Sequence, residues 1–198
     1  QKKYGTISYG VNKMYLMMEK QHNRGQDGAG FASVRLDASP GEKYVHRRRS
    51  AGKQPIQEIF QEINNEIKNH TPLDIDGNIP YIGQLMLGHV RYGTFGKNNI
   101  ESVHPFLRQN NWKHRNLIVA GNFNMTNNQE LFDNLVKLGQ HPKDKADGIT
   151  VMEKIGHFLD DSVSKIYRKL KKEGVSKMIA LALIEERLNL SKILKKAS

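Results

Sequence analysis

The sequence contains no cysteine among its 198 residues. This absence excludes disulfides and every metal site built on thiolate ligands. The eight histidines are scattered without an H-E-x-x-H or other ligand spacing, so we expect no metal site. No stretch approaches the roughly 18 consecutive apolar residues of a membrane helix, and the opening QKKYGTISYG lacks the apolar core of a signal peptide. We therefore expect a cytoplasmic protein that does not contact a membrane.

Positive charge is in excess, with 31 Lys and Arg against 20 Asp and Glu and a formal net charge of +11. Such a field attracts phosphate-bearing partners whatever the fold. One concentration is HRRRS, residues 46–50; the other lies on one predicted helical face and comprises Lys165, Arg168, Lys169 and Lys172. Nucleic-acid binders usually interleave aromatic residues or carry a recognisable module. We therefore interpret both groups as solvated surface, and a nucleic-acid-binding domain ranks last among our hypotheses.

Periodicity predicts mixed secondary structure in the first half of the chain. Apolar residues at helical spacing predict helices over residues 9–21, ending near Gly25, and over residues 55–69. Alternating residues predict strands over 29–37 and 43–49, separated by a Pro-Gly turn. Residues 72–80, PLDIDGNIP, read as a loop.

Two apolar runs on either side of the middle of the chain end in glycine and polar residues. Residues 84–91 predict a buried strand, and residues 116–124 repeat its form, so both ends could converge on one site. Residues 126–139 predict a helix capped by Thr126 or Asn127 and ended by Gly139. From Gly148 onward helix follows helix, without internal repeats or a clear linker. A length of 198 residues fits one domain with a hydrophobic core.

The polar residues that end these elements suggest a site for an amino acid. Arg91 could clamp a carboxylate, Asp147 could bind an ammonium group, and Asn122 could donate to an oxyanion. Singly, each is weak evidence, because an arginine or aspartate near a strand end is more often a surface ion pair. Gly25 equally fits a helix end, and Thr94 a turn cap.

Four motifs in order extend this interpretation: QHNRGQDGAG, GHVRYGTFG, GNFNMTNNQEL and ADGIT. In sequence and order they resemble the glutaminase domain of the amidophosphoribosyltransferases, which are class II glutamine amidotransferases, over roughly residues 4–155. The resemblance implies an α+β fold, the N-terminal-nucleophile hydrolase αββα sandwich. It also implies that residues 1–198 form a partial glutaminase domain, incomplete at both ends, without the phosphoribosyltransferase domain.

The resemblance carries roles over to individual residues. Arg91 matches the arginine that pairs with the α-carboxylate of glutamine, Thr94 a neighbouring hydroxyl, and Asp147 the aspartate that binds the α-ammonium group. Arg24 and Gly25 match the pair that positions the nucleophile. Asn122 matches the oxyanion asparagine; a glycine commonly follows it, but Phe123 stands here, so the second donor would be the Phe123 backbone N–H.

The family uses an N-terminal cysteine as its nucleophile, and this chain has none. The resemblance implies that ammonia from glutamine passes to phosphoribosyl pyrophosphate in the first committed step of purine biosynthesis. We expect the fragment itself to be inactive, with no cofactor in this domain, Mg only with the missing domain, and a homo-oligomeric protein. The alternative is a catalytically silent domain that acts as a glutamine sensor or assembly module.

Overall fold

The computed structural model describes residues 5–70, 79–93 and 99–198. The chain divides into two compact units, Gln1–Pro105 and Phe106–Ser198. Most of the predicted loop at residues 72–80 lies outside the described residues.

Both helices predicted in the first unit are present. α1 spans Tyr9–Lys20 and α2 spans Pro55–Asn69, with Pro55 at the first turn, where its missing N–H leaves no bond unmade. A short 3₁₀ helix, η1 (His22–Arg24), lies between the end of α1 and Gly25.

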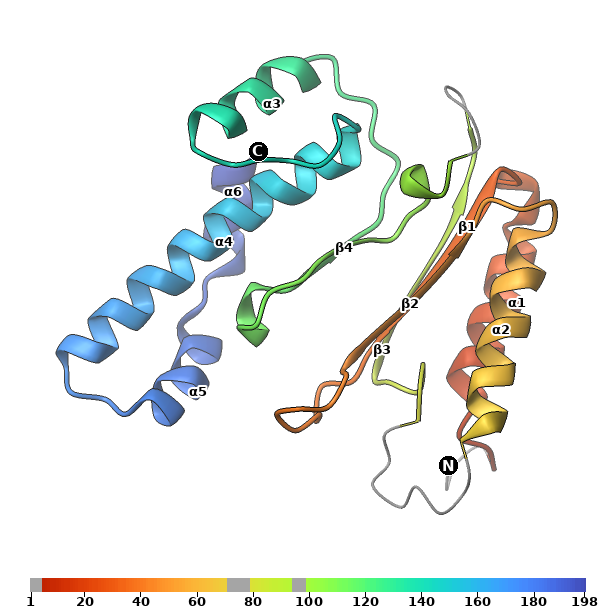
Figure 1. Cartoon of the computed structure of the whole chain (residues 1–198), viewed down its shortest axis with the longest axis horizontal. Coiled ribbons are helices and arrows are strands. Elements are labelled where there is room, and N and C mark those ends of the chain that lie inside the picture. The colour runs from red at the N-terminus through yellow and green to blue at the C-terminus, as the bar shows by residue number, and fades with distance from the viewer. Residues whose placement is uncertain (1–4, 71–78, 94–98) are drawn as a thin grey trace. The chain divides into compact units, whose positions relative to one another are not determined.

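The sheet of this unit has three antiparallel strands in the order β2-β1-β3. They are β1 (Gly28–Val34), β2 (Val45–Ser50) and β3 (Leu85–Arg91), which confirms the predicted strands. Figure 1 shows α1 and α2 side by side on one face of this sheet. Between helices and sheet lies a buried apolar core: Val11, Met18, Ala29, Phe31, Ile56, Ile59, Phe60, Ile63 and Tyr81.

The prediction that residues 84–91 form a buried strand is wrong in its burial. The strand forms, but Leu85 is 55% exposed and Leu87 36% exposed. β3 stands at one end of the strand order, and its alternate residues face opposite sides of the sheet. Gly88 faces α1, since a Cβ added there would lie 2.7 Å from the Met18 sulfur. The two leucines face the other side, which a continuous apolar run cannot reveal.

The second unit combines a two-stranded sheet with four helices. β4 (Phe106–Arg108) pairs antiparallel with β5 (Leu117–Val119), and 3₁₀ turns lie at Ile100–Ser102 (η2, in the first unit) and Lys113–Arg115 (η3). The helices are α3 (Asn128–Lys137), α4 (Asp147–Lys172), α5 (Lys177–Arg187) and α6 (Leu190–Ala197).

These elements confirm the predicted strand within residues 116–124 and the helices that follow it. Gly139 ends α3 with a φ of +80°, a conformation that favours glycine. Asn127 occupies the N-cap position of α3, although its side chain makes no capping bond. None of the helices in the described part of the chain is both long and apolar enough to span a bilayer. A separate apolar core joins α4, α5 and α6: Leu159, Val163, Leu170, Ala180, Ile184 and Ile193.

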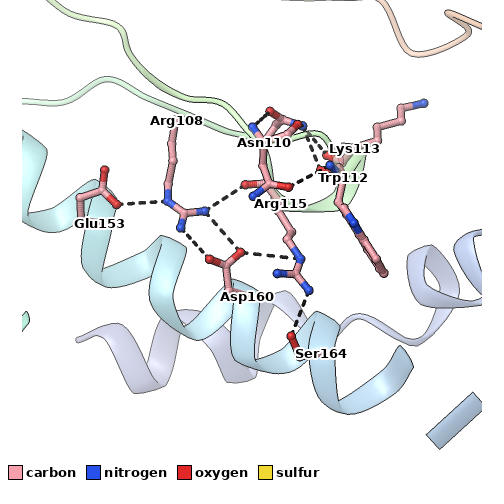
Figure 2. A network of polar contacts seen from close by, with 9 residues as sticks. Arg108, Asn110, Trp112, Lys113, Arg115, Glu153, Asp160 and Ser164 are labelled. Atoms are coloured by element: carbon pink, nitrogen blue, oxygen red, sulfur yellow. Dashed lines mark hydrogen bonds and ion pairs between the residues drawn. The ribbon is translucent and has the colours of Figure 1, made fainter. Parts of the chain in front are cut away.

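An ionic network connects the β4–β5 pair to α4 (Figure 2). The Arg108 side chain, only 15% exposed, reaches Glu153 with Nε at 3.1 Å and Asp160 with Nη2 at 2.6 Å. Arg115 lies 4.0 Å from the same Asp160 carboxylate and donates to the Ser164 hydroxyl at 3.0 Å. Both arginines are therefore held against one face of α4.

Candidate functional site

The predicted site residues fall into two groups, one in each unit. Arg24, Gly25 and Arg91 lie in Gln1–Pro105, whereas Asn122, Phe123 and Asp147 lie in Phe106–Ser198. Thr94 lies outside the described residues.

Gly25 packs directly on the backbone at the end of β3. A Cβ added to Gly25 would lie 2.8 Å from the carbonyl carbon and oxygen of Arg91 and from the carbonyl carbon of Val90. Real Cβ atoms do not approach backbone this closely, so only glycine fits. Its φ is −173°, which is extended backbone, and α1 has already ended at Lys20. Gly25 is therefore required by a close approach between two motifs and does not itself end the helix.

Asp27 joins the same two motifs by hydrogen bonds. Its backbone N–H donates to the Arg91 carbonyl at 3.0 Å, and its Oδ2 accepts from the Gly93 N–H at 2.7 Å. Sequence reasoning passed over this residue as a site candidate. The available signal was its position inside RGQDG, where a carboxylate stands two residues after the candidate Gly25.

Arg91 and Arg24 differ in exposure. Arg91, the last residue of β3, is partly buried, whereas Arg24 in η1 is exposed. A Cβ added to Gly93 would lie 3.4 Å from Arg91 Nη1 and 3.2 Å from Asp27 Oδ2, so both side chains lie against that backbone. A guanidinium presents paired N–H groups that match a carboxylate. Arg91 thus offers a carboxylate-binding group beside the RGQDG segment.

A strap formed by residues 103–105 crosses the sheet face opposite α1 and α2. The crossing is close at Gly30, where an added Cβ would lie 1.9 Å from the His104 carbonyl oxygen. The His104 ring stacks on that of His89, with 4.6 Å between centroids. Burial lowers the pKa of His104 to about 4, and the positive charges of His89 and Arg91 act in the same direction. The strap therefore brings a neutral imidazole close to Arg91.

The basic stretch HRRRS is used inside the protein, so its interpretation as solvated surface is wrong. Arg47 and Arg49 donate to the backbone carbonyls at the two ends of the strap, at 3.2 and 2.9 Å. Arg48 points to the other face of β2, where it pairs with Glu62 and Glu66 of α2. The other basic group is exposed, as predicted: Lys165, Arg168, Lys169 and Lys172.

In the second unit, Asp147 lies beside the loop that carries Asn122 and Phe123. Asp147 is the first residue of α4, and its Oδ2 accepts from the Met125 N–H at 2.8 Å. A carboxylate at a helix N-terminus is favoured by the helix dipole. A carboxylate has about four acceptor positions, so this single bond leaves capacity for an ammonium group. Asp147 both anchors the loop and can bind a cation.

The two oxyanion candidates lie next to each other in this loop. Asn122 is exposed, and Phe123 is partly buried. A Cβ added to Gly121 would lie 2.7 Å from the tip of the Phe123 ring, so the ring is folded back over that glycine. The bulky residue that follows Asn122 is thus accommodated because residue 121 has no side chain.

A cavity of about 250 Å³ lies between α1 and β3, and its lining includes Met14, Met17 and Met18 as well as Lys20, Gln21 and His89. Neither Arg24 nor Arg91 lines it. Within the described ranges, no three His, Asp or Glu side chains lie close enough to share a metal ion. Each unit therefore carries its own group of candidate residues, Arg24, Gly25 and Arg91 in the first and Asn122, Phe123 and Asp147 in the second.

Comparison with known proteins matches the chain to amidophosphoribosyltransferases, although no protein-family model matches it. The enzyme of Methanocaldococcus jannaschii is 28% identical over 176 residues, and that of Bacillus subtilis is 31% identical over 163 residues. The alignments cover 85% and 79% of this chain but 32% and 29% of the two relatives. The chain thus spans about a third or less of their length.

Solved structures show the same fold. A structure described as the allosteric regulatory enzyme of purine biosynthesis has a TM-score of 0.56 and 20% identity over 94% of this chain and 30% of its own. Glutamine phosphoribosylpyrophosphate amidotransferase from B. subtilis, complexed with ADP and GMP, has a TM-score of 0.50 and 22% identity over 93% of this chain and 29% of its own. The predicted α+β N-terminal-nucleophile hydrolase fold is confirmed. In sequence and in fold, the chain is a homologue of part of the amidophosphoribosyltransferases.

Proposed function

We propose that this chain is the glutamine-binding part of an amidophosphoribosyltransferase-like enzyme of the cytoplasm. The complete enzyme hydrolyses glutamine and transfers the ammonia to phosphoribosyl pyrophosphate in purine biosynthesis. The observation that carries the proposal is the packing of RGQDG on the end of β3, which brings Gly25 and Asp27 against Arg91. This contact joins the two most specific motifs of the resemblance.

Each site residue has a chemical role in this proposal. Arg91 binds the α-carboxylate of glutamine through paired hydrogen bonds, and Asp147 binds the α-ammonium group. Asn122 and the backbone N–H of Phe123 stabilise the oxyanion that forms at the side-chain amide carbon. Thr94 assists beside Arg91. Arg24 and Gly25 position the attacking group.

The nucleophile in this proposal is a cysteine thiolate. It attacks the amide carbon, the C–N bond breaks, and ammonia leaves after taking up a proton. Water then hydrolyses the thioester to glutamate and restores the thiol. Because the 198 residues contain no cysteine, the chain by itself binds glutamine without turning it over.

A second candidate is a catalytically silent domain that senses glutamine. The observation that favours it is again the absence of cysteine. The two candidates are separated by the terminal residue of the mature natural protein, determined by intact mass and terminal peptide mapping. A processed N-terminal cysteine supports the enzyme, and any other terminus supports the sensor.

The proposed role of Arg91 is tested by calorimetric titration of the chain with glutamine. Arg91→Ala removes a charge-assisted pair of bonds, so we expect binding to weaken by about 1.5 to 3 kcal/mol, at least tenfold in Kd. Arg91→Lys keeps the charge but loses the planar fork, and its loss should be smaller.

Arg168→Ala is the charge-matched control, because Arg168 is exposed on α4. Its affinity for glutamine should equal that of the wild type. Wild-type binding that survives Arg91→Ala would remove the carboxylate role, and a wild-type chain that does not bind glutamine would overturn the proposed function.

A further inference from the structure

Asp27 makes two contacts with the chain at the end of β3, one to Arg91 and one two residues further on. Its backbone N–H donates to the carbonyl of Arg91, and its carboxylate accepts from the N–H of Gly93, at 3.0 and 2.7 Å. Arg91 is also the last residue paired in the β1–β3 ladder, opposite Gly28. The Asp27 side chain therefore extends the attachment between the two segments two residues beyond Arg91.

A carboxylate suits this position better than a neutral side chain. Hydrogen bonds from backbone N–H groups to an ionised acceptor are stronger than those between neutral groups. The Arg91 guanidinium lies against the same Gly93 backbone, so the negative charge of Asp27 is favourable there as well. Gly93 in turn allows this approach, because a Cβ at that residue would lie 3.2 Å from Asp27 Oδ2.

Gly25 also contacts the backbone at the end of β3. Its lack of a side chain lets the RGQDG backbone rest on the carbonyls of Val90 and Arg91. The backbone of Arg91 is thus contacted at its own carbonyl, at the preceding residue and two residues beyond. A guanidinium on a fixed backbone loses less conformational entropy when it binds a ligand.

We infer that Asp27 is a positioning residue for carboxylate recognition, acting through Arg91 without touching the ligand. The inference rests on the proposed function, since it assigns to Asp27 the orientation of the arginine that selects an α-amino acid. Loss of the side-chain acceptor at residue 27 should therefore weaken recognition of the ligand's carboxylate in particular, and leave contacts to the rest of the ligand intact.

The test compares two ligands on the full 198-residue chain by calorimetric titration. One is glutamine, and the other is its analogue with the α-carboxylate reduced to an alcohol. The ratio of their Kd values measures carboxylate recognition. Asp27→Ala should lower the preference for glutamine about tenfold, because a charge-assisted contact that orients the arginine is lost. A general destabilisation of the fold would weaken the binding of both ligands alike and leave the ratio of their Kd values unchanged.

Asp27→Asn and Asp37→Ala serve as the matched variants. The asparagine retains an acceptor for the Gly93 N–H, so its ratio should stay within about threefold of the wild type. Asp37 is also an aspartate beside an arginine, but its side chain is 68% exposed and pairs with Arg35. Its removal should leave the ratio unchanged.

The outcomes separate this inference from the proposed function. A wild-type chain that binds neither ligand would overturn the proposed function. Wild-type preference for glutamine that persists unchanged in Asp27→Ala would overturn the role of Asp27 alone. If Asp27→Ala does not fold, a tenfold loss of preference in a folded Asp27→Asn variant would contradict the acceptor role.

Discussion

At the scale of single residues, burial decides the protonation of two histidines in the first unit. His46 is 8% exposed and packs its ring 5.2 Å from that of Tyr81. Burial lowers the pKa of His46 to about 4, and the charge of Lys43 acts in the same direction. His104, which belongs to the strap, has its pKa lowered to about 4 by burial as well. Both imidazoles are neutral in the folded protein at neutral pH.

These shifts predict a loss of stability in mild acid. An unfolded histidine has a pKa of about 6.5, so between about pH 6.5 and 4 the unfolded chain binds more protons than the folded one. The contribution of these neutral histidines to the free energy of unfolding is fully present above about pH 6.5 and is lost as the pH falls toward 4. We expect the free energy of unfolding in urea to be lower at pH 5 than at pH 7 by on the order of 1 to 2 kcal/mol for each histidine.

Variants assign this dependence to the buried rings. His46→Gln should make the profile between pH 7 and 5 shallower, because only the contribution of His104 remains. His141→Gln, at an exposed position, should leave it as in the wild type. Profiles of equal slope for His46→Gln and wild type would contradict a depressed pKa at His46.

At the scale of elements, a glycine in α4 shows how helix propensity and packing oppose each other. Gly156 lies between Glu153 and Asp160 along the helix, beneath the Arg108 side chain. A Cβ added to Gly156 would lie 2.6 Å from Arg108 Nε and 2.7 Å from its Cδ. The arginine cannot easily move away, because both carboxylates hold its guanidinium. Glycine here makes room for the ionic network of Figure 2.

Gly156→Ala should therefore destabilise the protein although alanine favours helices. Propensity alone predicts a gain of about 1 kcal/mol, whereas overpacking against a fixed neighbour costs about 1 to 3 kcal/mol. We expect a net loss of about 1 kcal/mol, measured by chemical unfolding. In an Arg108→Ala background the clash is absent, so the same substitution should become stabilising. An equal effect of Gly156→Ala in both backgrounds would contradict this account.

In β2, as in α4, the environment of a side chain depends on the segments that pack against the element. HRRRS has the composition of a solvated basic patch, yet β2 lies between α2 on one face and the strap on the other, and each provides acceptors for arginine. Local periodicity predicts the helices and the existence of the strands because it reports which residues share a face. It cannot report which segment covers that face.

At the scale of the whole molecule, the missing cysteine predicts binding without turnover. The 198-residue chain should bind glutamine but release no ammonia or glutamate from it, since no thiolate is present to form the thioester. The measurement is a coupled assay for glutamate over several hours. Added glutaminase in the same sample provides the positive control. Ammonia release that Asn122→Ala abolishes would show a nucleophile other than cysteine.

The helices, most of the strands and the relationship to amidophosphoribosyltransferases could be predicted from the sequence alone. Helical and alternating periodicity are local properties, and the order of motifs such as RGQDG and VRYGT is read directly from the chain. Arg91, Asn122 and Asp147 were proposed from those motifs, and their roles stay predictions.

The contacts between segments far apart in sequence became visible only in the folded structure. Gly25 proved to be required by the backbone of β3. Leu85 and Leu87 are exposed because they lie on the face of an end strand that is turned away from α1. Asp27 reaches Gly93 across 66 positions of sequence. The physical reason is the same in each case. Burial and hydrogen bonding depend on which atoms meet in space, and composition and spacing do not specify those meetings.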